Sequence, residues 1–121
     1  MTIYPTHKCF DDALELLERQ ARADEPATLV HAICHDRTIG DFSHAWIELD
    51  GLAIFAGILE GQREFFGTPA PDFYAKIGMR EMTRYSIREA YEFNRRFGTY
   101  GPWEEKYLAL CRDRRRCPTG A

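Results

Sequence analysis

The sequence predicts an α+β domain in which an N-terminal helix packs on a small antiparallel sheet of three to four strands, followed by two C-terminal helices. Three observations predict this fold. An amphipathic stretch begins at Cys9, two apolar segments flank a tight turn at residues 50–51, and helical patterns return after Ser86. Strands grouped together, rather than alternating with helices, favour an antiparallel sheet. The 121 residues fit a single domain, residues 1–121.

Residues 9–22 predict the first helix. Asp11 and Asp12 in the first turn and Arg19 and Arg22 in the last complement the helix dipole. Apolar side chains recur with helical spacing and form one stripe, at Phe10, Ala13, Leu14, Leu17 and Ala21.

The strands of the sheet are expected to follow. Residues 28–35 are nearly all apolar or small, which is typical of a strand covered on both faces. Residues 43–49 and 52–57 predict a hairpin, because Asp50-Gly51 is a dipeptide favoured in two-residue hairpin loops.

The next part of the chain has a weaker pattern. Residues 60–71 contain two glycines and two prolines, which favours a loop. Residues 74–85 predict one further strand.

Two helices are expected at the end of the chain. Ser86 followed by Glu89 has the spacing of a capping box, and Gly98 is a typical residue just beyond a helix C-terminus. Pro102 is favoured in the first turn of a helix and predicts that the last helix covers residues 103–116.

The composition is that of an ordinary globular domain. Hydrophobic residues make up 45% and charged residues 29% of the chain, and the formal net charge is −3. This charge gives no general attraction to nucleic acid or to anionic membranes. No apolar run approaches the ~20 residues of a membrane-spanning helix, and the first ten residues lack the pattern of a secretory signal. We therefore expect a cytoplasmic protein without nucleic-acid or membrane partners.

Metal and cofactor binding are not expected. The chain has four cysteines, none in a C-x-x-C pair, and so few cysteines favour thiols over a disulfide scaffold. His31 and His35 share one face of a predicted strand, but Cys34 between them points to the other face. A basic run at residues 112–116 is more typical of a solvated chain end than of a phosphate site.

Cys9 and His44 form the candidate catalytic pair. Cys9 begins the first helix, where unpaired N–H groups favour a thiolate and can also stabilise an oxyanion. His44 begins the first hairpin strand and is the candidate base. For these two residues the alternatives are a half-buried structural thiol and a histidine bonded to backbone. Trp46 and Trp103 are candidate substrate-binding residues, with core packing as the alternative.

The sequence also resembles a known family. The segments "KCFDDALELLERQ", "ATLVHAI" and "SHAWIELDG" resemble the catalytic core of the transglutaminase-like branch of the papain-fold cysteine proteins. They are most similar to lasso-peptide leader peptidases and to small bacterial and phage proteins with a "HAWVE" strand. The similarity covers residues 8–57. It implies that Cys9 is the nucleophile, that His44 is the base, and that an acid or amide on the next strand orients the imidazole.

The third position departs from the family pattern. With a two-residue loop, His44 is predicted to face Gly57, and no side chain at positions 55–57 accepts a hydrogen bond. Glu48 is predicted on the same face as His44 but lies ~13 Å along the strand. Glu60 is the nearest carboxylate beyond the strand.

Two functions are therefore predicted. The first is a small cysteine hydrolase or acyltransferase that acts on a peptide or amide bond through Cys9 and His44. The second is a catalytically inactive relative that keeps the fold as a binding or interaction module. The cysteine and histidine favour the first function, whereas the missing acid favours the second.

Overall fold

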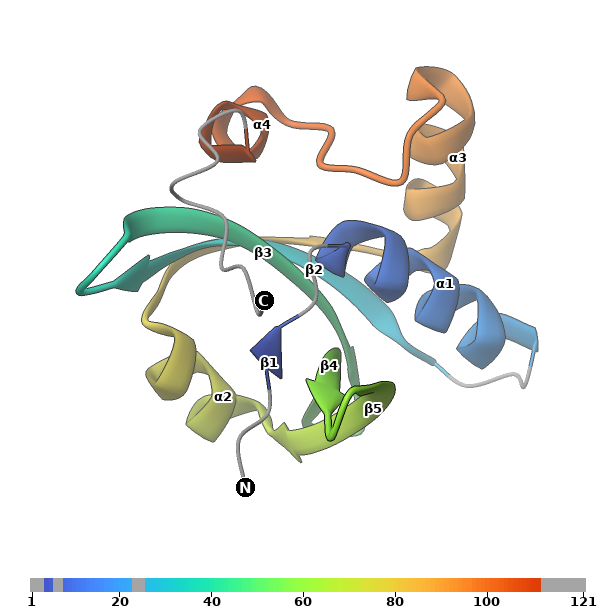
Figure 1. The fold of residues 1–121 in the computed structure, drawn as a ribbon. Coiled ribbons are helices and arrows are strands. Elements are labelled where there is room, and N and C mark those ends of the chain that lie inside the picture. Colours follow the sequence, from blue (N-terminus) through green and yellow to red (C-terminus); the bar gives the residue numbers. More distant parts are fainter. Residues whose placement is uncertain (1–3, 6–7, 23–25, 112–121) are drawn as a thin grey trace.

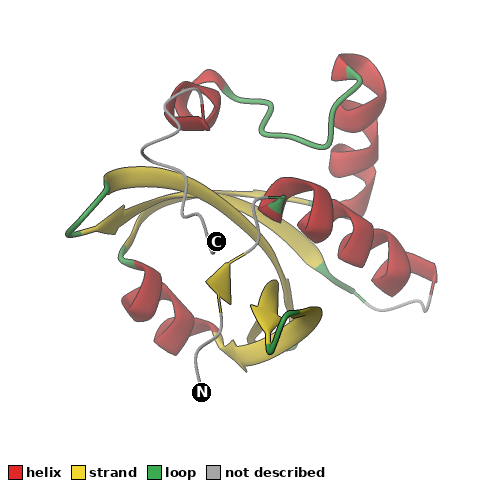
Figure 2. Cartoon of the chain, in the orientation of Figure 1, coloured by secondary structure: helices red, strands yellow, loops and turns green. Residues whose placement is uncertain are grey.

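The computed structural model describes residues 4–5, 8–22 and 26–111 and has the predicted α+β class, with an antiparallel sheet and helices around it (Figures 1 and 2). The helices are α1 (Cys9–Arg22), α2 (Ala70–Ile77), α3 (Ile87–Phe97) and α4 (Glu105–Cys111). The strands are β1 (Tyr4–Pro5), β2 (Thr28–Asp36), β3 (Gly40–Leu49), β4 (Leu52–Leu59), β5 (Gln62–Pro69) and β6 (Met79–Tyr85). The described sheet thus has six strands instead of the three to four predicted. Among the described helices, none combines the length and the apolar character that crossing a bilayer requires.

The sheet has the strand order β1-β4-β3-β2-β6, and β5 also pairs with β4. β2 and β3 pair along their whole length, whereas β3 and β4 pair only next to their turn, from Ile47 opposite Ile54 to Leu49 opposite Leu52. Beyond that point β4 leaves β3, and Gly57 pairs with Pro5 of β1 instead. β5 pairs along the other edge of β4. This divergence accompanies the strong curvature of β3 in Figure 1.

The hairpin turn is confirmed. Asp50 and Gly51 have φ angles of 52° and 78°, the left-handed conformation that a type I′ turn requires of both residues. The turn sets the predicted pairing next to it, but that pairing does not extend to His44, because the two strands separate first.

The loop predicted over residues 60–71 is wrong. Glu60 and Gly61 have φ angles of 53° and 81° and make a second tight turn, so the chain reverses directly into β5. The two prolines lie at the start of a helix and not in a loop. Pro69 occupies the N-cap position of α2, and Pro71 lies in its first turn.

The helical predictions are confirmed in part. α1 has the predicted bounds. α3 has the predicted capping box, in which the Ser86 hydroxyl accepts from the Glu89 N–H and the Glu89 carboxylate accepts from the Ser86 N–H. α4 begins at Glu105, so Pro102 lies in the segment before it rather than in its first turn. Residues 112–116 lie outside the described residues.

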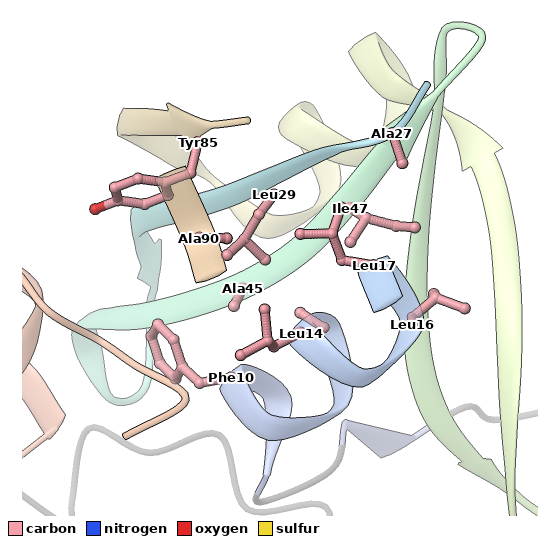
Figure 3. Close-up of a cluster of buried hydrophobic side chains, with 11 residues drawn as sticks. Phe10, Leu14, Leu16, Leu17, Ala27, Leu29, Ala45, Ile47, Tyr85 and Ala90 are labelled. Carbon is pink, nitrogen blue, oxygen red and sulfur yellow. The ribbon is translucent and has the colours of Figure 1, made fainter. Parts of the chain in front are cut away.

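Side chains from the two faces of the sheet form two buried clusters. α1, α3 and α4 lie on one side of the sheet and α2 on the other (Figure 1). The first cluster, here the α1-side cluster, is shown in Figure 3 and includes Phe10, Leu14, Leu17, Leu29, Ala45 and Ile47. The second, the α2-side cluster, comprises Val30, Ala32, Cys34, Phe42, Trp46, Ala53 and Phe73. Fully burying a large apolar side chain stabilises the fold by ~1.5–3 kcal/mol.

Candidate functional site

Cys9 lies at the start of α1, as predicted. Its side chain is partly buried against the α1-side cluster. In the same turn the Asp12 carboxylate is buried and accepts a hydrogen bond from Arg63 of β5 at 2.7 Å. α1 is therefore attached to the sheet by an ion pair close to Cys9 as well as by apolar packing.

His44 lies on the opposite face of the sheet. Its ring is 6% exposed and contacts Phe42 and Trp46 of its own strand and Phe73 of α2, with ring centroids 5.9–6.3 Å apart. Nδ1 is buried and has no hydrogen-bond partner among the described residues. Burial lowers the pKa of His44 to about 4, so the ring is neutral near pH 7.

The structure does not bring Cys9 and His44 together. Side chains alternate across a strand, and Ala45 and Ile47 face α1, so His44 faces α2. The predicted substrate-binding tryptophans are separated in the same way. Trp46 belongs to the α2-side cluster with His44, whereas Trp103 packs against the α1-side cluster, as Cys9 does.

The prediction that His44 faces Gly57 is wrong, because β3 and β4 pair only from Ile47 to Leu49. Gly57 pairs with Pro5 and Glu64, so the residues at 55–57 are not strand partners of His44. Glu60 lies in the β4–β5 turn.

Glu48 has a set of hydrogen-bond partners that no sequence pattern indicated. Its side chain is 10% exposed, and its Oε2 accepts hydrogen bonds from Trp46 Nε1 at 3.0 Å and from the Tyr74 hydroxyl. Arg84 of β6 donates to Oε1 at 2.5 Å and to the Tyr74 oxygen at 3.0 Å. Burial and the hydrogen bond to Glu48 raise the pKa of Tyr74. This cluster links β3 and β6 to α2, and in it the largely buried Glu48 carboxylate is paired with Arg84.

His31 faces the same side of the sheet as Cys9. It is fully buried on β2, and neither Nδ1 nor Nε2 has a hydrogen-bond partner among the described residues. The rings of Phe10, Tyr85, Trp103 and Tyr107 surround it, with centroid distances of 4.8, 4.8, 5.0 and 6.1 Å. Burial lowers the pKa of His31 to about 3.

A polar layer lies beside these rings. Glu104 accepts hydrogen bonds from the hydroxyls of Thr83 and Tyr85, both at 3.0 Å, and Thr83 also bonds the Tyr107 hydroxyl at 2.6 Å. Ser43 donates to the Tyr107 carbonyl at 2.6 Å. Burial and the hydrogen bond to Glu104 raise the pKa of Tyr85. No local pattern in the sequence indicated this layer, because its members are far apart in the chain.

Comparison with known proteins does not assign the chain to a family. No family model, curated protein or solved structure matches the chain. Within residues 4–5, 8–22 and 26–111, no three histidine, cysteine or acidic side chains are grouped in a way that would hold a metal ion.

Proposed function

We propose that this chain is a catalytically inactive relative of the papain-fold, transglutaminase-like proteins and acts as a peptide-binding module in the cytoplasm. The observation that carries the proposal is the placement of Cys9 and His44 on opposite faces of the sheet. A nucleophile and its base act together only within hydrogen-bond reach of one another, ~3–4 Å for a thiol. The relationship itself is supported by a helix that begins at a cysteine and packs on an antiparallel sheet containing the "HAW" strand.

The residues of that strand have packing roles that support a non-catalytic function. His44 and Trp46 lie against Phe73 of α2, and Glu48 binds three donors within the protein. These side chains are therefore occupied in attaching α2 to the sheet.

We place the binding surface on α3 and the segment that follows it. Tyr91, Phe97 and Tyr100 are 39%, 50% and 47% exposed, and exposed aromatic side chains are enriched at protein-binding surfaces. A shallow hollow of about 640 Å³ lies between Arg95 and Tyr100. Neither Arg88 nor Arg95 forms an ion pair with a described residue.

The chemistry of this surface favours an acidic peptide with aromatic or aliphatic side chains. Arginines without internal partners attract carboxylates, and the neighbouring tyrosines supply apolar contact area. Charged contacts of this kind weaken as salt screens them, over a Debye length of ~10 Å at 0.1 M.

One experiment with two readouts tests the proposal. Iodoacetamide labelling near neutral pH, followed by mass spectrometry of each cysteine, is compared in the wild type, His44→Gln and His35→Gln, in which a partly buried histidine paired with Asp41 is replaced as the control. We expect Cys9 to be labelled at the same rate in all three.

In parallel, acidic peptides selected from a random library are titrated by fluorescence polarisation. We expect Tyr100→Ala and Arg95→Glu to weaken binding at least ten-fold and Arg37→Glu, at the distant β2–β3 turn, to leave it unchanged.

Two results would overturn the proposal. Rapid labelling of Cys9 that disappears only in His44→Gln would indicate an activated thiol and a catalytic function. Failure of every acidic peptide to bind, or stronger binding of a single-stranded oligonucleotide at the same surface, would exclude a peptide-binding module.

A further inference from the structure

The segment between α3 and α4, residues 98–104, covers His31. Trp103 from this segment lies 5.0 Å from the imidazole, measured between ring centroids. Gly101 lies so close that a Cβ atom on it would be 2.8 Å from Cε1 of His31. The Thr99 carbonyl accepts hydrogen bonds from Asn94 of α3 at 2.8 Å and from Trp103 Nε1 at 2.9 Å, which hold this covering segment in place.

The covered ring lacks partners for its polar atoms. A neutral imidazole has one N–H donor and one acceptor nitrogen, and an imidazolium has two N–H donors. Both nitrogens of His31 are buried without a hydrogen-bond partner in the described part of the chain. Protonation in place would therefore bury a charge and a second unpaired donor, which a protein avoids by rearranging or by keeping the group neutral.

No neighbouring charge compensates for this. The elements around His31 carry titratable side chains on α1, β6, the covering segment and α4, and none of them forms a hydrogen bond with either ring nitrogen. Asp12 binds Arg63, and Glu104 binds Thr83 and Tyr85. The titratable groups on these elements include Cys9, Asp11, Asp12, Glu104 and the two tyrosines whose rings contact His31, Tyr85 and Tyr107.

We propose that residues 98–104 form an acid-released cover, which leaves His31 when the imidazole takes up a proton from solvent. Release hydrates the imidazolium and exposes the surrounding aromatic rings. This inference does not rest on the proposed peptide binding, but the cover includes Tyr100, so its release would also alter the proposed binding surface.

The direction and size of the effect follow from linkage. The open state exposes the ring and binds its proton with an ordinary pKa near 6.5, whereas the covered state binds it only near pH 3. The open state thus gains protons as the pH falls below 6.5, and the ratio of open to covered molecules rises ~10-fold per pH unit from there. Between pH 7.5 and pH 4.5 we expect an increase of ~100-fold.

The two tryptophans provide separate reporters of this step. Trp103 lies beside His31, and Trp46 lies beside His44 on the other face of the sheet. The intact protein is labelled with 5-fluorotryptophan, and the two ¹⁹F resonances are assigned with Trp103→Phe. Their solvent isotope shifts are followed from pH 7.5 to pH 4, with far-UV circular dichroism as a check on the fold. We expect Trp103 to become solvent-exposed at a higher pH than Trp46 and before the helical signal decreases.

Two variants connect this transition to His31. His31→Phe removes the titrating group and is expected to leave Trp103 covered down to the pH of global unfolding. Gly101→Ala places a Cβ against the ring at a φ angle of 111°, so it is expected to move the release to higher pH while His31 is retained. The proposal is overturned if both tryptophans become exposed together with loss of the fold, or if the Trp103 transition is unchanged in either variant.

Discussion

Glu48 shows how one side chain can fix several parts of this fold. Its carboxylate accepts hydrogen bonds from Trp46, Tyr74 and Arg84, which belong to β3, α2 and β6. Trp46 is fully buried and Tyr74 is partly buried, so water cannot fully replace the Glu48 carboxylate as their hydrogen-bond acceptor if it is removed. The charge of Arg84 is less important, since its side chain is 51% exposed.

Glu48→Ala is expected to destabilise the protein by ~2–4 kcal/mol, because it leaves the Trp46 N–H and the Tyr74 hydroxyl without their acceptor. The free energy of unfolding is measured in urea. Glu15→Ala removes exposed ion pairs with Arg19 and Arg63 and serves as the control, with an expected loss below ~1 kcal/mol. Equal losses of unfolding free energy in the two variants would show that the hydrogen bonds of Glu48 contribute no more to stability than exposed ion pairs do.

Among the secondary-structure elements, α2 depends on the backbone of a single glycine at its end. Gly78 has a φ angle of 63° and ends α2 in the left-handed conformation. Its carbonyl also accepts a hydrogen bond from the His35 N–H at 3.0 Å, and a Cβ on it would collide with the His35 carbonyl oxygen. The end of α2 is thus pressed directly against β2.

Gly78→Ala is expected to destabilise the fold by ~2–3 kcal/mol, because it combines a strained φ angle with a backbone contact that cannot move aside. Gly61→Ala is the matched control. Gly61 has a φ angle of 81°, but a Cβ on it would meet no atom within 4 Å, so only the conformational strain of ~1 kcal/mol is expected. Thermal unfolding of both variants checks the difference, and the steric argument fails if they unfold at the same temperature.

The elements that could be predicted are those specified by residues close together in the sequence, such as an amphipathic helix, a tight turn or a helix cap. The stripe from Phe10 to Ala21 predicted α1 with its bounds, and the Asp50-Gly51 turn and the Ser86 capping box were both confirmed. β5 and α2 were missed because the same glycines and prolines are compatible with a loop and with a turn followed by a helix start. Their roles depend on the second tight turn at Glu60 and on the pairing of β5 with β4.

The candidate site was less predictable for a different reason. Alternation placed His44, Trp46 and Glu48 on one face of the strand, and the structure agrees. Alternation does not say which face a helix far away in the sequence will cover. Long-range packing, of α1 against Ala45 and of α2 against Trp46, determines which face each helix covers. The side of the sheet on which Cys9 lies could therefore not be predicted from any local pattern.

At the scale of the whole molecule, both faces of the sheet bury a histidine that unfolding exposes. Burial lowers the pKa of His31 to about 3 and that of His44 to about 4, against about 6.5 in an unfolded chain. The unfolded state therefore binds more protons at mildly acidic pH. The stability associated with these groups is fully present above pH 6.5 and decreases as the pH falls toward their folded-state values.

Each histidine is expected to lower the free energy of unfolding by ~1.4 kcal/mol per pH unit below pH 6.5, which gives ~2.7 kcal/mol per unit for the pair. Urea unfolding at pH 7.5, 6 and 5 measures the slope. The double variant His31→Phe/His44→Phe should lose most of it, whereas His35→Gln, which replaces a partly buried histidine paired with Asp41, should retain it. A wild-type slope that matches the double variant would contradict the assignment.

The branching of the sheet at β4 leaves β1, β5 and β6 as outer strands, each paired on one side only among the described residues, and β5 and β6 are the longer of the three. β5 carries Arg63 and Glu64, and β6 carries Arg80 and Glu81. A second molecule that extended the ladder at either strand would have to accommodate these charged side chains. Unpaired outer strands favour pairing between molecules, and charged side chains on those strands oppose it.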